Sequence, residues 1–182
     1  MFSRTIAVLL CLIVSFSSAF AAGFGGSGKL KDSTTNRLVR FLERNIELCR
    51  SLDTVYRYDC YRQKYSAAAG KLAGKPAYAV PLGALLDVHR SLDRIVAINT
   101  DPTVKRLRVK RDSFRAITPD STAEANESFR SALDEAATEL LRSYEGVGDH
   151  FARIAQVLNS NKALLRAMLR LFDRSAPDHM LG

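Results

Sequence analysis

Apolar residues recur every three or four positions along most of the chain, the spacing that places side chains on one face of an α-helix. The first such stretch follows Ser33 and Thr34, either of which can cap a helix N-terminus. Its apolar face is formed by Leu38, Leu42, Ile46 and Cys49. A polar turn follows at residues 51–53, so the pattern predicts a helix and then a reversal of the chain.

The same spacing continues toward the C-terminus. A second helix is expected to end near residues 70–74, and a third to run to about Asn99. Ser121 and Glu124 have the spacing of a capping box, which predicts the start of a long fourth helix. Near the C-terminus we expect two more helices, because residues 159–161 form a polar break between two apolar faces.

The segment from Asp101 to Ile117 fits two interpretations. Asp101 and Pro102 resemble a helix cap followed by a first-turn proline. A helical face could then be formed by Val104, Leu107, Phe114 and Ile117. Residues 106–110, however, alternate polar and apolar side chains as a half-buried strand does. Helix and strand both remain open for residues 104–111.

These elements predict an all-α fold, a single helical bundle of about five to seven helices over residues 33–174. The chain shows no internal repeat and no change of composition that would mark a second domain. Residues 22–32 are rich in Gly, Ala and Ser and are expected to form a flexible leader. Residues 175–182 are expected to form a frayed tail.

The first 21 residues have the order of a secretory signal peptide. A charged start at residues 1–4 precedes an apolar run at residues 6–14 and small residues at Ala19 and Ala21. We therefore expect an exported protein, periplasmic or secreted, and the Arg- and Ala-rich composition suggests a bacterial source. The alternative is an uncleaved anchor that tethers the domain to the membrane, because no charge occurs between Arg4 and Lys29.

Export determines which cysteines can form a disulfide. Cys11 would leave with the signal peptide, and Cys49 and Cys60 would reach an oxidising compartment as a pair. Along one helix the two would lie about 16 Å apart, whereas a disulfide needs Cα atoms within roughly 7 Å. A bond between them therefore requires the chain to turn back, which predicts a disulfide-stapled helical hairpin. Two independent buried thiols are the alternative.

The formal net charge is +8, and the positive charge is densest in one segment. Six cations fall within eleven residues: Lys105, Arg106, Arg108, Lys110, Arg111 and Arg115. Such a segment suits an acidic protein, an acidic polysaccharide or an anionic membrane surface. The alternative is a solvated helix face neutralised by acids of neighbouring helices, such as Glu124, Glu127 and Asp134.

Signatures of catalysis are absent from the sequence. It contains no zinc-protease or nucleophile-elbow motif, and no metal site or cofactor is predicted. His89, on an apolar stripe near Asp87, is the one histidine that could anchor a metal or acid–base site. The tyrosines of residues 56–65 alternate with cations, but the spacing of three of them favours a packed helix face over stacking on nucleobases or sugars, and nucleic acid is not expected as a partner.

The leading hypothesis is a non-enzymatic exported bundle that binds an acidic partner through residues 105–115. One alternative is an enzyme or metal-binding protein with a site around His89. Another is a structural subunit that buries its amphipathic faces against copies of itself.

Overall fold

The computed structural model describes residues 28–143 and 149–175, with side chains described as far as residue 167. These residues form five α-helices: α1 (Asp32–Arg50), α2 (Thr54–Gly70), α3 (Ala79–Asn99), α4 (Thr122–Arg142) and α5 (His150–Ser175). Short 3-10 helices, η1 (Pro76–Tyr78) and η2 (Pro119–Ser121), precede α3 and α4. The expected signal peptide, most of the leader and residues 176–182 of the tail lie outside the described residues.

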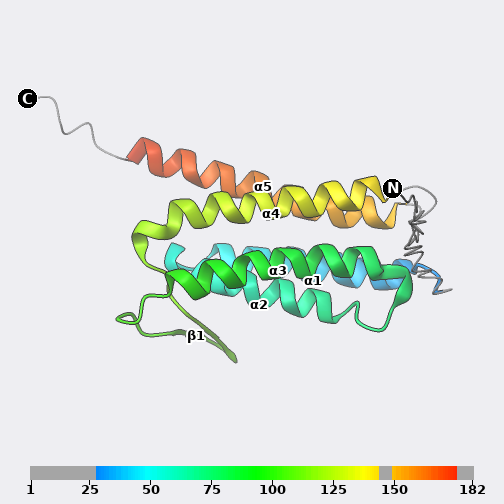
Figure 1. The fold of residues 1–182 in the computed structure, drawn as a ribbon, viewed down its shortest axis with the longest axis horizontal. Helices are drawn as coiled ribbons and strands as arrows, with labels where there is room; N and C mark the ends of the chain where they lie inside the picture. The colour runs from blue at the N-terminus through cyan, green and yellow to red at the C-terminus, as the bar shows by residue number, and fades with distance from the viewer. Residues whose placement is uncertain (1–27, 144–148, 176–182) are drawn as a thin grey trace, which may run out of the picture.

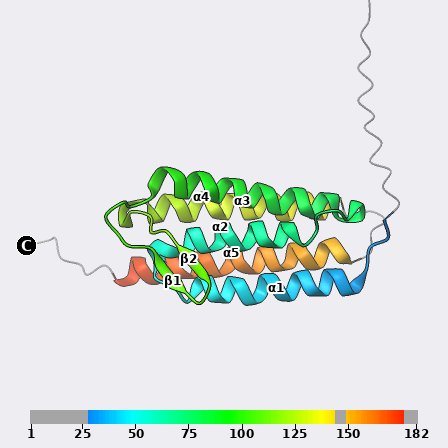
Figure 2. The ribbon, with the colours of Figure 1, turned by 90° about the horizontal axis from the view of Figure 1, so that it is seen from below.

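The helices pack in two layers, with α1, α2 and α3 in one and α4 and α5 in the other (Figures 1 and 2). Each helix contacts the next one along the chain, and α5 returns to contact α1, so the five helices enclose one core. The prediction of an all-α bundle of about five to seven helices is therefore confirmed. Among the described residues, no helix combines the length and the apolar character that crossing a membrane requires.

The predicted disulfide-stapled hairpin is present at the junction of α1 and α2. The chain turns at residues 51–53, and Cys49 and Cys60 form a disulfide with their Cα atoms 5.5 Å apart. Both cysteines are fully buried. The helix begins at Asp32, and Lys31 occupies its N-cap position, two or three residues before the predicted caps Ser33 and Thr34.

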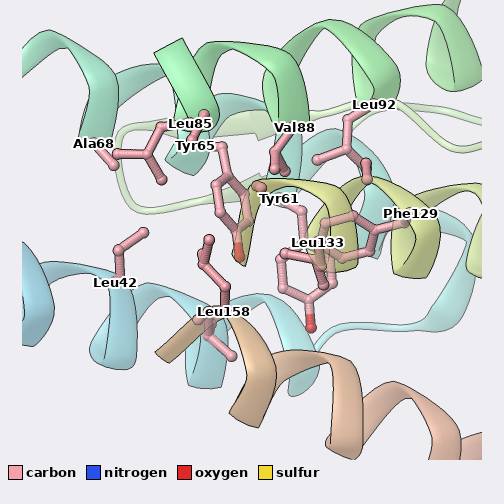
Figure 3. Close-up of a cluster of buried hydrophobic side chains, with 14 of the residues drawn as sticks. Leu42, Tyr61, Tyr65, Ala68, Leu85, Val88, Leu92, Phe129, Leu133 and Leu158 are labelled. Carbon is pink, nitrogen blue, oxygen red and sulfur yellow. The ribbon is translucent and has the colours of Figure 1, made fainter. Parts of the chain in front are cut away.

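The core is built around aromatic side chains of α2 and α4. The Tyr61 ring lies 4.8 Å from that of Phe129, and the Tyr65 ring packs edge-on against Phe129 at 5.9 Å. Figure 3 shows these rings surrounded by aliphatic side chains of α1, α3, α4 and α5. The tyrosines of α2 are therefore a packed helix face, as their spacing predicted, and the stacking alternative has no exposed rings at Tyr61 and Tyr65 to support it.

The predicted break at residues 159–161 is wrong, because α5 continues through it. Asn161 is buried, and its Nδ2 donates a hydrogen bond to the Tyr65 hydroxyl at 3.0 Å. Ser160 donates its hydroxyl proton to the Gln156 carbonyl one turn earlier. Asn161 thus bonds to a residue of α2 and Ser160 to the backbone of α5, and these contacts override the low helix propensity of both residues.

The predicted capping box at the start of α4 is also wrong. Ser121 occupies the N-cap position, but its hydroxyl donates to the Thr118 carbonyl at 2.8 Å instead of capping α4. The 3-10 turn η2 before α4 brings Thr118 within reach, so the serine closes that turn.

Residues 104–117 do not form a helix. They contain an antiparallel hairpin of β1 (Leu107–Val109) and β2 (Asp112–Phe114), in which Leu107 pairs with Phe114 and Val109 with Asp112. Asp101 does not cap a helix either, since its Oδ1 accepts hydrogen bonds from the backbone and hydroxyl of Thr103 in a local turn. Of the two open interpretations, the strand is confirmed.

Reducing the Cys49–Cys60 disulfide should lower the free energy of unfolding by about 3 kcal/mol, because the unfolded chain regains the entropy of a short loop. Urea denaturation with and without reductant measures the difference. The double variant Cys49→Ala/Cys60→Ala provides the control, and its midpoint should not respond to reductant. Equal midpoints for the oxidised and reduced parent would contradict the prediction.

Alkaline pH should unfold the protein cooperatively. Burial raises the pKa of Tyr58 from about 10 to about 12, and burial also raises the pKa of Tyr61 and Tyr65. Because the fold favours the neutral phenols, their contribution is fully present below pH 10 and is lost as pH rises through the folded values. Ultraviolet absorbance of tyrosinate and far-ultraviolet circular dichroism should change together above about pH 10. Gradual ionisation with intact helicity would show that the tyrosines are accessible.

Candidate functional site

The predicted anion-binding segment is a β-hairpin fastened to α2, and we call residues 105–115 the basic hairpin. Its main attachment is Asp59, whose side chain is fully buried. The Asp59 carboxylate accepts the backbone N–H of Arg115 at 2.7 Å, Nε of Arg62 at 2.7 Å and Nε2 of Gln63 at 3.2 Å. A buried carboxylate is stable only with such partners, so the hairpin and α2 complete one another.

Further contacts run along the rest of the hairpin. Nε2 of Gln63 also donates to the Ser113 carbonyl at 3.0 Å, and the Lys64 ammonium lies 2.6 Å from the Asp112 carboxylate. The side chain of Phe114, the last residue of β2, is fully buried. At the start of the segment, the Tyr56 hydroxyl donates to the Lys105 carbonyl at 3.0 Å. The hairpin is therefore held to α2 at both ends and along β2.

Strand alternation turns the cations outward. Leu107 and Val109 are half-buried, whereas Arg106, Arg108 and Lys110 are exposed. Lys110 opens the two-residue turn with a φ of 55°, in the left-handed region. Residues 106–110, which alternate in the sequence, thus present the cations Arg106, Arg108 and Lys110 on one side of the hairpin.

Five of the six predicted residues present their charge to solvent. Among the described residues, no carboxylate lies within 4.0 Å of any cation of this set: Lys105, Arg106, Arg108, Lys110 and Arg111. The Arg106 guanidinium instead donates to the hydroxyl and carbonyl oxygens of Ser113, both at 3.0 Å. The hairpin thus combines a fixed backbone with unneutralised charge.

The sixth residue, Arg115, has a different role. Its side chain is 30% exposed, and its guanidinium lies 3.7 Å from Asp59 Oδ1. Together with its backbone N–H, this contact makes Arg115 an anchor of the hairpin. Arg115 is therefore not one of the exposed cations of the hairpin.

Two of the three acids proposed to neutralise the segment, Glu127 and Asp134, pair with other residues. Glu127 pairs with Arg130 on its own helix at 2.8 Å, and Asp134 pairs with Lys162. The hydrogen bond from Lys162 lowers the pKa of the Asp134 carboxyl below its usual value. The structure pairs neither acid with the hairpin, so the predicted neutralisation by these two residues is wrong.

Among the described residues, His89 belongs to no group of three potential metal ligands. Its Nδ1 donates to the Arg62 carbonyl at 3.1 Å, and the nearby Asp87 pairs with Arg90. A polar groove of about 760 Å³ between α3 and α4 passes His89, with Glu135 and Glu139 on its other wall. In the described part of the chain, three potential metal-ligand atoms come within 4.8 Å of one another only at a different set of residues.

That set consists of Asp32, Asp149 and His150. Arg153 lies 3.0 Å from Asp32 and 3.7 Å from Asp149, so a guanidinium already compensates both carboxylates. Nδ1 of His150 is 2.8 Å from the Thr35 hydroxyl. These contacts account for the cluster as an ion-paired link between α1 and α5.

No protein-family model, curated protein or solved structure shows a significant match to this chain. The function is therefore argued from the residues alone.

The residues that position the hairpin were not predicted as functional. Asp59, Gln63 and Lys64 lie among the tyrosines of α2, and in the sequence they read as the polar side of an amphipathic helix. Asp59 and Arg62 do have the spacing of an ion pair within a helix. Only the fold shows that Asp59 is buried and that it also accepts a hydrogen bond from the backbone of Arg115.

Replacing Asp59 should release the hairpin. Asp59→Ala removes the acceptor of the Arg115 backbone N–H and one of the two acceptors of the Gln63 amide, so we expect a loss of about 3–5 kcal/mol in the free energy of unfolding. Trypsin should then cleave the basic hairpin faster than in the parent. Urea denaturation and timed proteolysis with mass spectrometry measure the two effects.

Asp93→Ala is the matched control, because Asp93 also contacts Arg62 but is 53% exposed. Its loss should cost less than about 1 kcal/mol and leave proteolysis of the hairpin unchanged. Equal stability of the two variants would show that Asp59 does not anchor the hairpin.

Proposed function

We propose that this protein is an exported, non-enzymatic helical bundle that binds an acidic partner through the basic hairpin. The observation that carries the proposal is the set of five exposed hairpin cations without a carboxylate partner among the described residues. A rigid support lowers the entropic cost of binding, because the cations need not be ordered when the partner arrives.

The disulfide is evidence for the compartment in which the protein acts. A bond between Cys49 and Cys60 indicates an oxidising, exported environment. Cleavage of residues 1–21 as a signal peptide, a periplasmic or secreted destination and a bacterial source are parts of the proposal. Partners that suit such a compartment are an acidic protein, an acidic polysaccharide or an anionic membrane surface.

The chemistry of the hairpin fits an anion more closely than a catalytic role. Three of its five exposed cations are arginines, whose planar guanidinium can form two parallel hydrogen bonds with a carboxylate, sulfate or phosphate. The interaction is electrostatic and solvent-exposed, so added salt should weaken it steeply.

Neutralising the hairpin should abolish most of this binding. For Arg108→Gln/Lys110→Gln/Arg111→Gln, we expect retention on vesicles of anionic lipid and on immobilised polyglutamate at low ionic strength to fall at least about ten-fold, at roughly 1 kcal/mol per removed cation. Cosedimentation and affinity chromatography, each with a salt titration, measure the effect. Circular dichroism should show an unchanged fold, since these side chains are exposed.

A control variant removes the same charge from another surface. Arg90→Gln/Arg94→Gln/Arg142→Gln alters three exposed cations of α3 and α4 and should keep parental retention. If the hairpin variant and this control retain equally, net charge and not the hairpin governs binding, and the proposal fails.

A further inference from the structure

A second concentration of cations lies where α1 begins and α2 ends, away from the hairpin, which contacts the earlier part of α2 (Figure 2). Two hollows of about 520 and 440 Å³ adjoin there and share Thr34, Arg37 and Lys75 in their walls. We call them together the basic trough. Its cations are Lys29, Lys31, Arg37, Arg40, Arg44, Lys71 and Lys75, and no Asp or Glu of the described residues lines either hollow.

The trough arises from a separation of charge around α1. Arg37, Arg40 and Arg44 follow one another at intervals of three and four, so they form a stripe along one side of the helix. The three acids of α1 lie elsewhere. Asp32 pairs with Arg153 of α5, Glu47 pairs with Arg50, and Glu43 and Glu47 line a different hollow, between α1 and α5. The positive stripe therefore faces the end of α2 across hollows that none of these acids lines.

The cationic side chains are already oriented. Nε of Arg37 donates to the Ser33 carbonyl at 3.1 Å, and Nε of Arg44 donates to the Arg40 carbonyl at 3.2 Å. The Lys71 ammonium lies 4.3 Å from the centre of the Phe41 ring. Among the described residues, the terminal guanidinium nitrogens of Arg37 and Arg44 have no hydrogen-bond acceptor, and none of the seven cations lies within 4.0 Å of a carboxylate. Donors for an anion are thus in place.

This arrangement is unfavourable for the protein by itself. Like charges spaced three or four residues apart on a helix repel one another, and the repulsion weakens when an anion binds between them. A surface that keeps such repulsion favours binding over stability, as functional sites commonly do.

The shape of the trough indicates the kind of anion. Seven cations spread over two joined hollows suit a chain with repeated negative groups better than one small anion. A membrane surface fits poorly, because the large exposed hydrophobic residues of the described chain, Ile98, Val104 and Leu141, do not line the trough. A peptide strand fits poorly too, because helix walls offer no strand edge to pair with its backbone.

We infer that the basic trough binds an acidic polysaccharide, with guanidinium and ammonium groups contacting successive carboxylates or sulfates of the sugar chain. An exported protein with a disulfide reaches the compartment where such polymers occur. The inference does not depend on the basic hairpin, which lies on a separate part of the structure and contributes no residue to the trough.

The trough variant Arg37→Gln/Arg40→Gln/Arg44→Gln tests the site. We expect its affinity for polygalacturonate and dextran sulfate, measured by isothermal titration calorimetry at low ionic strength, to fall about ten-fold or more. Its melting temperature should be equal to or above that of the parent, because repulsion is relieved. Lys71→Gln/Lys75→Gln, on the other wall, should show a smaller loss of the same kind.

Two comparisons make the result specific. The hairpin variant Arg108→Gln/Lys110→Gln/Arg111→Gln and the control Arg90→Gln/Arg94→Gln/Arg142→Gln remove the same charge elsewhere, and both should bind polysaccharide more tightly than the trough variant. With the hairpin variant, which keeps the trough and lacks the hairpin charges, polyglutamate of similar charge density and vesicles of anionic lipid should bind more weakly than the polysaccharides.

Parental polysaccharide affinity in the trough variant would overturn the inference, whatever the hairpin variant does. Equal losses in the trough, hairpin and control variants would also overturn it, because net charge would then explain binding. Equal or tighter binding of polyglutamate would indicate an acidic peptide, and equal or tighter binding of vesicles a membrane, so either result would reject a polysaccharide as the partner.

Discussion

The buried carboxylate of Asp59 is the interaction on which the hairpin depends. A carboxylate removed from water requires hydrogen-bond donors, and Asp59 obtains one from the backbone of Arg115 and others from Arg62 and Gln63 of its own helix. The next residue, Cys60, is joined to α1 by the disulfide, so this part of α2 is fixed against the bundle. The hairpin is therefore attached to one of the most constrained parts of the fold, and its outward cations share that rigidity.

The helices could be predicted because their apolar residues repeat over many turns. Leu38, Leu42 and Ile46 recur at helical spacing and all are buried, so several independent positions support one interpretation. The stapled hairpin could be predicted as well, because the distance between two cysteines on one straight helix excludes a bond and a polar turn lies between them. Both inferences rest on local geometry, which the sequence contains directly.

The remaining features depend on contacts between distant residues. Asn161 reads as a helix breaker, yet Tyr65, 96 positions away, gives its amide a buried partner. The alternation at residues 106–110 is too short to distinguish a strand from a helix. The strand is established by its pairing with residues 112–114, which end at the buried Phe114. The basic trough has members at residues 29–44 and 71–75, so no single window of the sequence shows the concentration of charge. The stripe of arginines on α1 was the one local signal of it.

Ion pairing explains why the two basic surfaces stay positive. Many acids of the described chain form ion pairs with cations outside the two basic surfaces. Asp112 pairs with Lys64, Asp134 with Lys162, and Asp32 with Arg153. Most of the cations that pair with no carboxylate among the described residues gather on the hairpin and in the trough. Gathering them increases repulsion in the free protein, and a ligand carrying several negative charges relieves that repulsion most. Two separate surfaces with this property favour an extended anion over a single small one.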